Sequence, residues 1–250
     1  MERHSDEASL VSRFFTDNLT DGGTVAVITG DDVKHIRKVL RLEPGDSVDI
    51  CDGHGTEYSG VIRSVEADAV TVSLGAPSVS PAEPEHAVTL FQGYPKAGKL
   101  ETVIQKCTEI GVSSVVPVVM KRSVAIPSGD GTQKLVRLQR VAEEAAKQSR
   151  RGLIPAVGTP VRLTAIDLDA FDLIIVAYEL EQDATLKQVL RSRPDAKRIA
   201  LFVGPEGGFE PDEVELLKAH GAVAVTLGKR ILRTETAGPV MLAQVLYEFE

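Results

Sequence analysis

The chain has 250 residues, enough for one large domain or two small ones. With 43% hydrophobic and 26% charged residues it resembles ordinary globular proteins, and no apolar run approaches the ~20 residues that cross a bilayer. The formal net charge of -8 argues against nonspecific nucleic-acid binding, and the charged N-terminal sequence lacks the apolar core of a secretion signal, so a cytoplasmic protein is expected.

Residues 1–76 are predicted to form a small β domain. Short strands separated by regular turns are typical of a small barrel. The expected strands are Thr24–Ile28, Ser47–Cys51, Thr56–Val65 and Ala69–Leu74. Between the first two strands the spacing predicts a helix over Asp31–Leu40, with one buried face formed by Val33, Ile36, Val39 and Leu40.

Three prolines without hydrophobic periodicity mark residues 77–86 as a linker. Residues 87–250 then alternate strands and helices, which is the pattern of an α/β domain with a mainly parallel sheet. The expected strands are Ala87–Gln92, Ser114–Met120, Leu173–Tyr178, Ile199–Val203 and Ala222–Leu227. The expected helices contain Leu100–Cys107, Leu135–Ala145, Pro211–His220 and the C-terminal stripe of Leu242, Val245, Leu246 and Phe249.

The two cysteines lie far apart and lack the spacing of metal ligands. Cys51 falls in a predicted strand and Cys107 on the apolar face of a predicted helix. Both positions are typical of buried thiols, so neither cysteine is expected to be catalytic.

The most informative loop is GPEGGF, Gly204 to Phe209, at the end of an apolar strand. Its glycines let a ligand approach the backbone, although a glycine pair alone often marks only a tight turn. The acidic residues of the following helix start, Glu210 to Glu213, oppose an anion at that helix terminus. The sequence also lacks both common phosphate-binding patterns. A neutral or cationic ligand is therefore favoured, and the sulfonium adenosine of S-adenosylmethionine meets that description.

A second loop, Leu227 to Ala237, concentrates positive charge between a strand and the last helix. Lys229, Arg230 and Arg233 lie beside Glu235, which favours a phosphate-facing loop but also fits a solvated surface. Similar clusters occur in the first predicted helix, at Lys96 and Lys99, and in the KQSRR stretch that ends at Arg151. Such local concentration of charge in an acidic protein favours a polyanionic partner.

These motifs together resemble the SPOUT superfamily of knotted methyltransferases. Within it, the chain is similar along nearly its whole length to the ribosomal RNA small-subunit (uracil-N3)-methyltransferase family. The similar segments are GPEGGF, LGKRILRTETA, HIRKVLRLEPGD, KAGKLETVIQKCTEIGV and EEAAKQSRRGLIPAV. Two positions depart from the family pattern: Arg150 replaces a commonly small residue, and Cys107 replaces a usual alanine.

The resemblance implies a PUA-like β-barrel that binds RNA, a SPOUT domain with a deep trefoil knot, and a homodimer. It also implies 16S ribosomal RNA as the substrate and S-adenosylmethionine as the cofactor. The cofactor is expected among three loops that contribute Tyr178, Glu179, Leu180, Gly204, Pro205, Gly207, Gly208, Leu227, Gly228, Ile231 and Leu232.

Methylation at N3 of uridine requires loss of an imide proton, and hence a base or a cation that stabilises the developing negative charge. Arg233 is the candidate for a uracil oxygen or the adjacent phosphate, Glu235 is the candidate base, and Glu206 is the second candidate. The predicted RNA contacts are Arg37, Arg41, Lys96, Lys99, Arg151 and Arg230. No metal is expected, because no residues have ligand spacing.

Two other functions remain open at this point. A methyltransferase of the same fold that acts on a ribose 2′-hydroxyl would keep the same loops. A noncatalytic RNA-binding or ribosome-assembly module would keep the fold but would not need the cofactor loops. The N-terminal motif and the LGKRILRTETA segment favour the uracil enzyme over the ribose enzyme. The intact GPEGG sequence, with Arg233 and Glu235, argues against a pure binding module.

Overall fold

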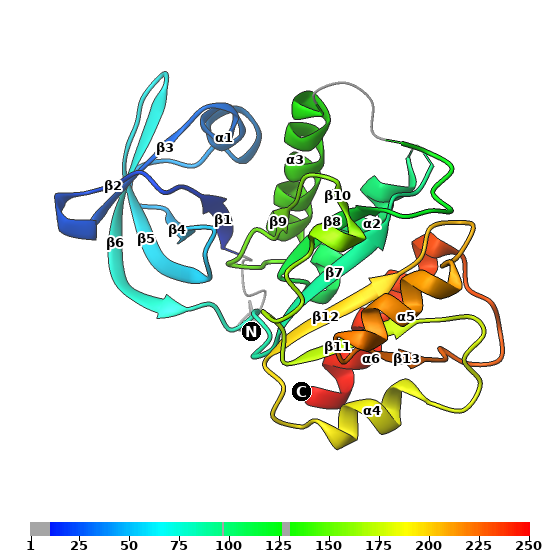
Figure 1. Cartoon of the computed structure of the whole chain (residues 1–250). Coiled ribbons are helices and arrows are strands. Elements are labelled where there is room, and N and C mark those ends of the chain that lie inside the picture. Colours follow the sequence, from blue (N-terminus) through cyan, green and yellow to red (C-terminus); the bar gives the residue numbers. More distant parts are fainter. Residues whose placement is uncertain (1–10, 97, 127–130) are drawn as a thin grey trace, which may run out of the picture. The chain divides into compact units, whose positions relative to one another are not determined.

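The computed structural model describes residues 11–96, 98–126 and 131–250. It contains two compact units, which are coloured along the sequence in Figure 1. The first comprises Met1–Pro81 together with Arg150–Leu153, and the second comprises Ala82–Ser149 and Ile154–Glu250. The short return of the chain to the first unit at Arg150–Leu153 was not predicted.

The N-terminal unit is built on one six-stranded sheet of order β1-β4-β5-β6-β3-β2. The strands are β1 (Ser12–Phe15), β2 (Leu19–Thr20), β3 (Val25–Thr29), β4 (Ser47–Cys51), β5 (Thr56–Val65) and β6 (Ala69–Val79). All four predicted strands are present, and β6 continues to Val79 instead of ending at Leu74. The two short strands β1 and β2 were missed. A buried cluster that includes Phe14, Ile28 and Ile50 forms the core of this unit.

The predicted helix is present, but only two of the four residues predicted for its buried face are buried. The chain forms α1 (Asp31–Lys34) and continues as a π-helical turn over His35–Leu40. Val33 and Ile36 are buried, whereas Val39 is 66% exposed and Leu40 is 36% exposed. A π-turn has more residues per turn than an α-helix, so the spacing rule fails after Ile36.

The C-terminal unit has a parallel sheet of order β10-β8-β7-β12-β11-β13, with β9 paired to β8. Its strands are β7 (Ala87–Gly93), β8 (Ser114–Val119), β9 (Ala156–Val157), β10 (Val161–Arg162), β11 (Leu173–Ala177), β12 (Arg198–Val203) and β13 (Val223–Val225). The predicted α/β class with a parallel sheet is confirmed.

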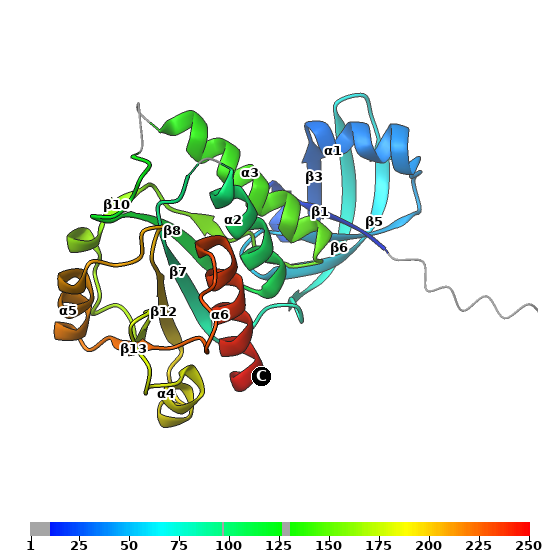
Figure 2. The same cartoon turned by 90° about the vertical axis from the view of Figure 1, so that its right-hand side faces the viewer.

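Helices cover both faces of this sheet (Figure 2). The helices are α2 (Lys99–Ile110), α3 (Thr132–Gln148), α4 (Leu186–Ser192), α5 (Pro211–Ala219) and α6 (Thr234–Phe249). Helices α2, α3, α4 and α6 contribute to one buried cluster, and α5 contributes to the other, with Phe202 and Phe209. Burying both faces explains why the strands are nearly continuous apolar runs.

Both cysteines are free and buried, as expected. Burial raises the pKa of Cys51 to about 11, although nearby Arg13 opposes this shift. Burial also raises the pKa of Cys107. Thiols that stay protonated at neutral pH are poor nucleophiles, which agrees with a structural role.

Asp172, just before β11, gives the C-terminal unit a testable pH dependence. Its carboxylate accepts a side-chain hydrogen bond from Arg198 at 2.8 Å and backbone hydrogen bonds from Arg198 and Lys197, which lower its pKa from 3.8 to about 2. A lowered native pKa stabilises the fold above the unfolded pKa, and this contribution disappears as the pH falls towards the native pKa.

We therefore expect Asp172→Asn to lower the melting temperature at pH 5, with the difference from the wild type shrinking between pH 4 and pH 2. Thermal unfolding at several pH values measures this difference. A difference that stays constant throughout that range would contradict the assigned role of the carboxylate.

Candidate active site

Three loops follow neighbouring strands at one edge of the parallel sheet. Ala177 of β11 is in register with Val203 of β12 and with Val225 of β13, and Val203 is in register with Gln92 of β7. Because the strands are parallel, their carboxyl ends meet at the same edge. The loops that follow β11, β12 and β13 therefore begin side by side, which is where open α/β sheets bind ligands.

The GPEGGF loop is closely packed against its neighbours. A Cβ atom on Gly93, at the end of β7, would lie 2.3 Å from the backbone nitrogen of Pro205. Gly208 has φ +71°, and a Cβ atom there would lie 2.3 Å from Oε1 of Glu179 in the adjacent loop. Only glycine fits at both positions without displacing its neighbours. The structure thus brings together the predicted cofactor residues of two loops.

Aromatic packing links the same two loops. The rings of Tyr178 and Phe209 meet edge to face with centroids 6.5 Å apart. Leu180 is 66% exposed and Ile231, in the third loop, is 89% exposed. These aliphatic side chains supply exposed apolar surface on two of the predicted cofactor loops, which suits the binding of a flat nucleobase.

Lys121 and Arg122, which follow β8, form hydrogen bonds with the GPEGGF loop and with the start of α5. Nη1 of Arg122 donates to the carbonyl oxygen of Gly207 at 3.2 Å, and its Nε donates to Glu210 at 2.8 Å. The backbone nitrogen of Lys121 donates to Glu213 at 2.8 Å. Sequence reasoning missed these residues, because nothing in their spacing relates them to a loop about 85 positions away.

A series of buried hydrogen bonds connects the GPEGGF loop to β7 and α6. Oγ1 of Thr234 donates to the carbonyl oxygen of Gly204 at 2.6 Å and accepts from Nε2 of Gln92 at 2.7 Å. Gln92 is completely buried, and its Oε1 has no hydrogen-bond partner. A polar residue at the end of an apolar strand is the signal in the sequence that marks Gln92.

Replacing Thr234 by valine leaves Gln92 and Gly204 with unpaired polar groups. We expect the free energy of unfolding to fall by about 1–3 kcal/mol for each group left unpaired. Urea denaturation measures the loss. Thr236→Val is the matched control, because Thr236 is exposed in the same helical turn and should change stability by less than about 0.5 kcal/mol. Equal effects of the two variants would contradict this account.

The two glutamates predicted as bases share one cation. Nζ of Lys99 lies 3.0 Å from Oε2 of Glu235 and 3.2 Å from Oε1 of Glu206. Glu206 also accepts a hydrogen bond from the backbone nitrogen of Lys96 at 3.0 Å. These residues come from three segments: the start of α2, the GPEGGF loop and the first turn of α6.

The electrostatics of this cluster oppose a role for either glutamate as a base. Burial alone would raise the pKa of Glu206, but hydrogen bonds from Lys96 and Lys99 outweigh it and lower that pKa. The pKa of Glu235 is lowered by its own backbone N–H and by Lys99 and Arg233, despite partial burial. The two nearby carboxylates, Glu235 first, raise the pKa of Lys99. The carboxylates are therefore ionised and weakly basic at neutral pH.

The remaining predicted RNA and substrate residues differ in accessibility. Lys96, Arg230 and Arg233 are exposed in the C-terminal unit, and Arg37 and Arg41 are exposed in the N-terminal unit. Arg151 is only 3% exposed. A buried guanidinium does not face a polyanion at the surface, so we do not propose Arg151 as an RNA contact.

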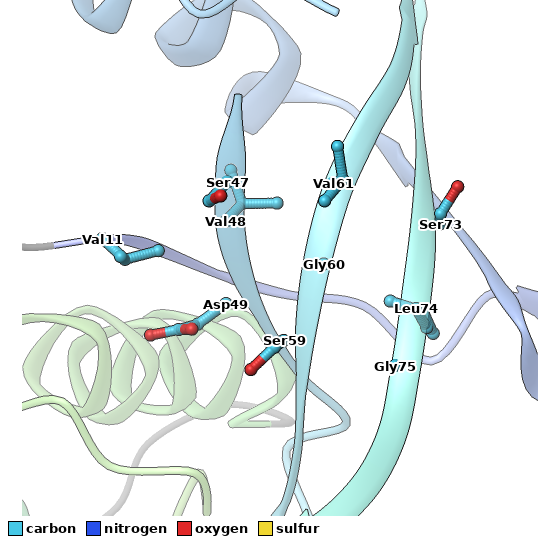
Figure 3. A pocket seen from close by; sticks show the side chains of 10 residues that line it. All are labelled: Val11, Ser47, Val48, Asp49, Ser59, Gly60, Val61, Ser73, Leu74 and Gly75. Atoms are coloured by element: carbon cyan, nitrogen blue, oxygen red, sulfur yellow. The ribbon is translucent and has the colours of Figure 1, made fainter. Parts of the chain in front are cut away.

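One hollow of about 420 Å³ lies on the N-terminal unit and not at the sheet edge just described. Figure 3 shows its lining, which comes from β4, β5, β6 and Val11. Hydroxyls of Ser47, Ser59 and Ser73 alternate with aliphatic side chains, and Asp49 is paired to Arg13 at 3.7 Å. None of the lining residues belongs to the three predicted cofactor loops.

Within residues 11–96, 98–126 and 131–250, no group of three His, Cys, Asp or Glu side chains is placed to hold a metal ion. In the same ranges, no helix is both long and apolar enough to cross a lipid bilayer.

Comparison with known proteins identifies the family. Residues 82–246 match the family described as RNA methyltransferase domain, and residues 28–75 match the RNA methyltransferase PUA domain. The chain belongs to this RNA methyltransferase family. The N-terminal match also confirms the predicted PUA-like domain.

Curated members of the family resemble the chain over most of its length. Ribosomal RNA small subunit methyltransferase E of Bacillus subtilis is 34% identical over 89% of this chain and 90% of its own. The protein of the same name from Mycobacterium tuberculosis is 36% identical over 93% of this chain and 90% of its own.

Solved structures of the family share the fold. Ribosomal RNA small subunit methyltransferase E from Neisseria gonorrhoeae, bound to S-adenosyl methionine, superposes with a TM-score of 0.80 at 26% identity and covers 94% of this chain and 96% of that one. A probable rRNA-methyltransferase from Porphyromonas gingivalis gives a TM-score of 0.78 at 26% identity, covering 96% and 98% of the two chains.

Proposed function

We propose that this protein transfers a methyl group from S-adenosylmethionine to N3 of a uridine in 16S ribosomal RNA of the small subunit. The observation that carries the proposal is the similarity, at 34–36% identity over about nine tenths of the chain, to ribosomal RNA small subunit methyltransferases E. The three loops at the carboxyl edge of the sheet supply a site of suitable chemistry.

The residues at this edge fit the cofactor. A Cβ atom on Gly208 would collide with Glu179, so the glycine keeps open a close approach between two loops. The exposed side chains of Leu180 and Ile231 add apolar surface suited to adenosine. We assign its binding to the three loops 178–180, 204–208 and 227–232.

The cofactor, when bound, supplies an electrophilic methyl group: the electron pair of N3 forms the new N–C bond, and the C–S pair stays on sulfur. The protein must release the N3 proton to water and stabilise the resulting charge on the uracil ring. Arg233, exposed at the start of α6 and without a described ion pair, is proposed to face a uracil oxygen or the adjacent phosphate.

RNA binding is proposed to use exposed cations on both units. Arg37 lies in the π-helical turn after α1 and Arg41 directly follows that turn, while Lys96 and Arg230 lie on loops of the C-terminal unit. Such contacts neutralise phosphates and weaken as salt rises. The trefoil knot and the homodimer rest on the family resemblance, and the cytoplasmic location on the expectation from the sequence; all three belong to this proposal.

The purified protein tests the proposal directly. Incubation with S-adenosylmethionine and unmethylated small-subunit ribosomal RNA, followed by digestion and nucleoside mass spectrometry, should yield 3-methyluridine. A 2′-O-methylated nucleoside would support the ribose methyltransferase instead. The absence of any methylated nucleoside, with RNA still bound, would support a noncatalytic binding module.

A further inference from the structure

The ion pairs of Lys99 with Glu206 and Glu235 are partly buried, unlike an ion pair that is fully exposed to solvent. The side chain of Lys99 is 30% exposed, and those of both glutamates are 21% exposed. Each residue comes from a different segment, and Glu206 is also fixed by the backbone of Lys96. Two anions therefore hold one ammonium group in place at the carboxyl edge of the sheet.

With respect to the described residues, the ammonium group of Lys99 keeps one N–H donor for a substrate. An ammonium group has three N–H donors, and the two carboxylates take two directions around Lys99. Arg233 contributes a second positive charge close enough to Glu235 to lower its pKa. Glu235 therefore contacts the ammonium group of Lys99 and also experiences the positive charge of Arg233.

The direction of attack explains why cations are needed here more than a base. The lone pair of N3 lies in the plane of the uracil ring, along the line of the departing proton. A fixed carboxylate that accepted this proton would occupy the line along which the methyl group must approach. Cations beside the ring oxygens O2 and O4 lie off that line and stabilise the charge that deprotonation creates.

We propose that Lys99 is a catalytic residue that donates a hydrogen bond to a uracil carbonyl oxygen and stabilises the N3 anion, while Glu206 and Glu235 position its ammonium group. The N3 proton passes to water. Arg233 faces the other carbonyl oxygen or the neighbouring phosphate. This inference rests on the proposed uridine methylation, and it replaces the predicted roles of Lys99 as a phosphate contact and of the glutamates as bases.

The test compares Lys99→Met with the wild type on two substrates. One is an RNA fragment with uridine at the position mapped by mass spectrometry of oligonucleotide fragments, and the other carries 5-fluorouridine there. Fluorine withdraws electrons and makes N3 more acidic, so the fluorinated substrate needs less help from a cation. We expect Lys99→Met to lower kcat on the uridine substrate by about 100-fold or more, and by at least about tenfold less on the fluorinated one.

A second readout does not depend on turnover. The ¹⁹F resonance of the bound fluorouridine, in the presence of S-adenosylhomocysteine, reports ionisation of N3 as the pH is raised. The wild type should lower the pKa of the bound base below that of the free RNA, and Lys99→Met should return it towards the free value. Equal pKa values in the two complexes would overturn the proposal.

Three further variants keep the test decisive. Lys106→Met, on the same helix and paired only with Glu109 within the described residues, is the matched control and should match the wild type. Lys99→Arg keeps the charge and should recover part of the rate, and Glu235→Gln should reduce kcat less than Lys99→Met does. A larger loss of kcat in Glu235→Gln than in Lys99→Met would instead support Glu235 as the general base.

The outcomes separate this inference from the proposed function. If the wild type forms no 3-methyluridine, the proposed function fails. If the wild type forms it but Lys99→Met raises only the KM for RNA, with kcat and the fluorouridine ratio unchanged, Lys99 is a phosphate contact and the inference alone fails.

Discussion

Gly208→Val is expected to reduce the affinity for S-adenosylmethionine by at least about 100-fold, which corresponds to about 2.7 kcal/mol. Gly208 has φ +71°, a conformation that a β-branched residue adopts only with strain. A Cβ atom there would also lie 2.3 Å from Oε1 of Glu179, so the Glu179 side chain in the adjacent proposed cofactor loop would have to move. Isothermal titration calorimetry of the variant with the cofactor measures the loss.

The control for this variant is Gly221→Val. Gly221 has φ +83° in the turn between α5 and β13, but no atom lies within 4 Å of the position where a Cβ would be added. Both variants should lose stability through backbone strain, while only the change at Gly208 should weaken cofactor binding. An unchanged affinity in Gly208→Val would remove the GPEGGF loop from the cofactor site.

Arg233→Ala is expected to lower kcat by about 100- to 1,000-fold while leaving cofactor affinity nearly unchanged. The side chain is exposed at the N-terminal boundary of α6, beside Glu235 and the proposed reacting edge. A cation that stabilises developing charge acts mainly in the transition state, so its loss appears in kcat. Steady-state kinetics with saturating RNA and cofactor, together with calorimetry, separate the two effects.

Arg230→Ala is the matched control from the same loop. Its guanidinium is exposed, and we assign it to an RNA phosphate. The variant should bind RNA more weakly, with the slope of log affinity against log salt reduced by about 1, and should retain kcat at saturating RNA. Parallel losses of kcat and cofactor affinity in Arg233→Ala would instead make Arg233 a structural residue.

The sequence was sufficient for the fold class because long apolar runs and turn residues repeat at regular spacing. The strands from Ala87 to Val225 are apolar on both faces, and the helices between them show one-sided stripes. Shorter elements escaped notice. Helix α4 has only seven residues, although Thr185 and Gln188 form a capping box that could have been recognised. The π-helical turn after Lys34 has more residues per turn than an α-helix, so the α-helical spacing wrongly placed Val39 and Leu40 on the buried face.

The site was predictable only in part. The three loops follow strand ends, so their placement at one edge follows from a parallel sheet. The pairing of Lys99 with Glu206 and Glu235 does not follow from the sequence. Lys99 is more than a hundred positions from either glutamate and meets them only through tertiary packing. Charge patterns identified them as functional candidates, but a pattern cannot tell which cation is already occupied by which anion.

Nucleoside mass spectrometry of small-subunit ribosomal RNA, from cells with and without this gene, tests the central claim most directly. The account predicts that 3-methyluridine disappears with the gene and returns with the wild-type gene but not with the Arg233→Ala variant. An unchanged level of 3-methyluridine, accompanied by the loss of another methylated nucleoside, would contradict methylation at uracil N3.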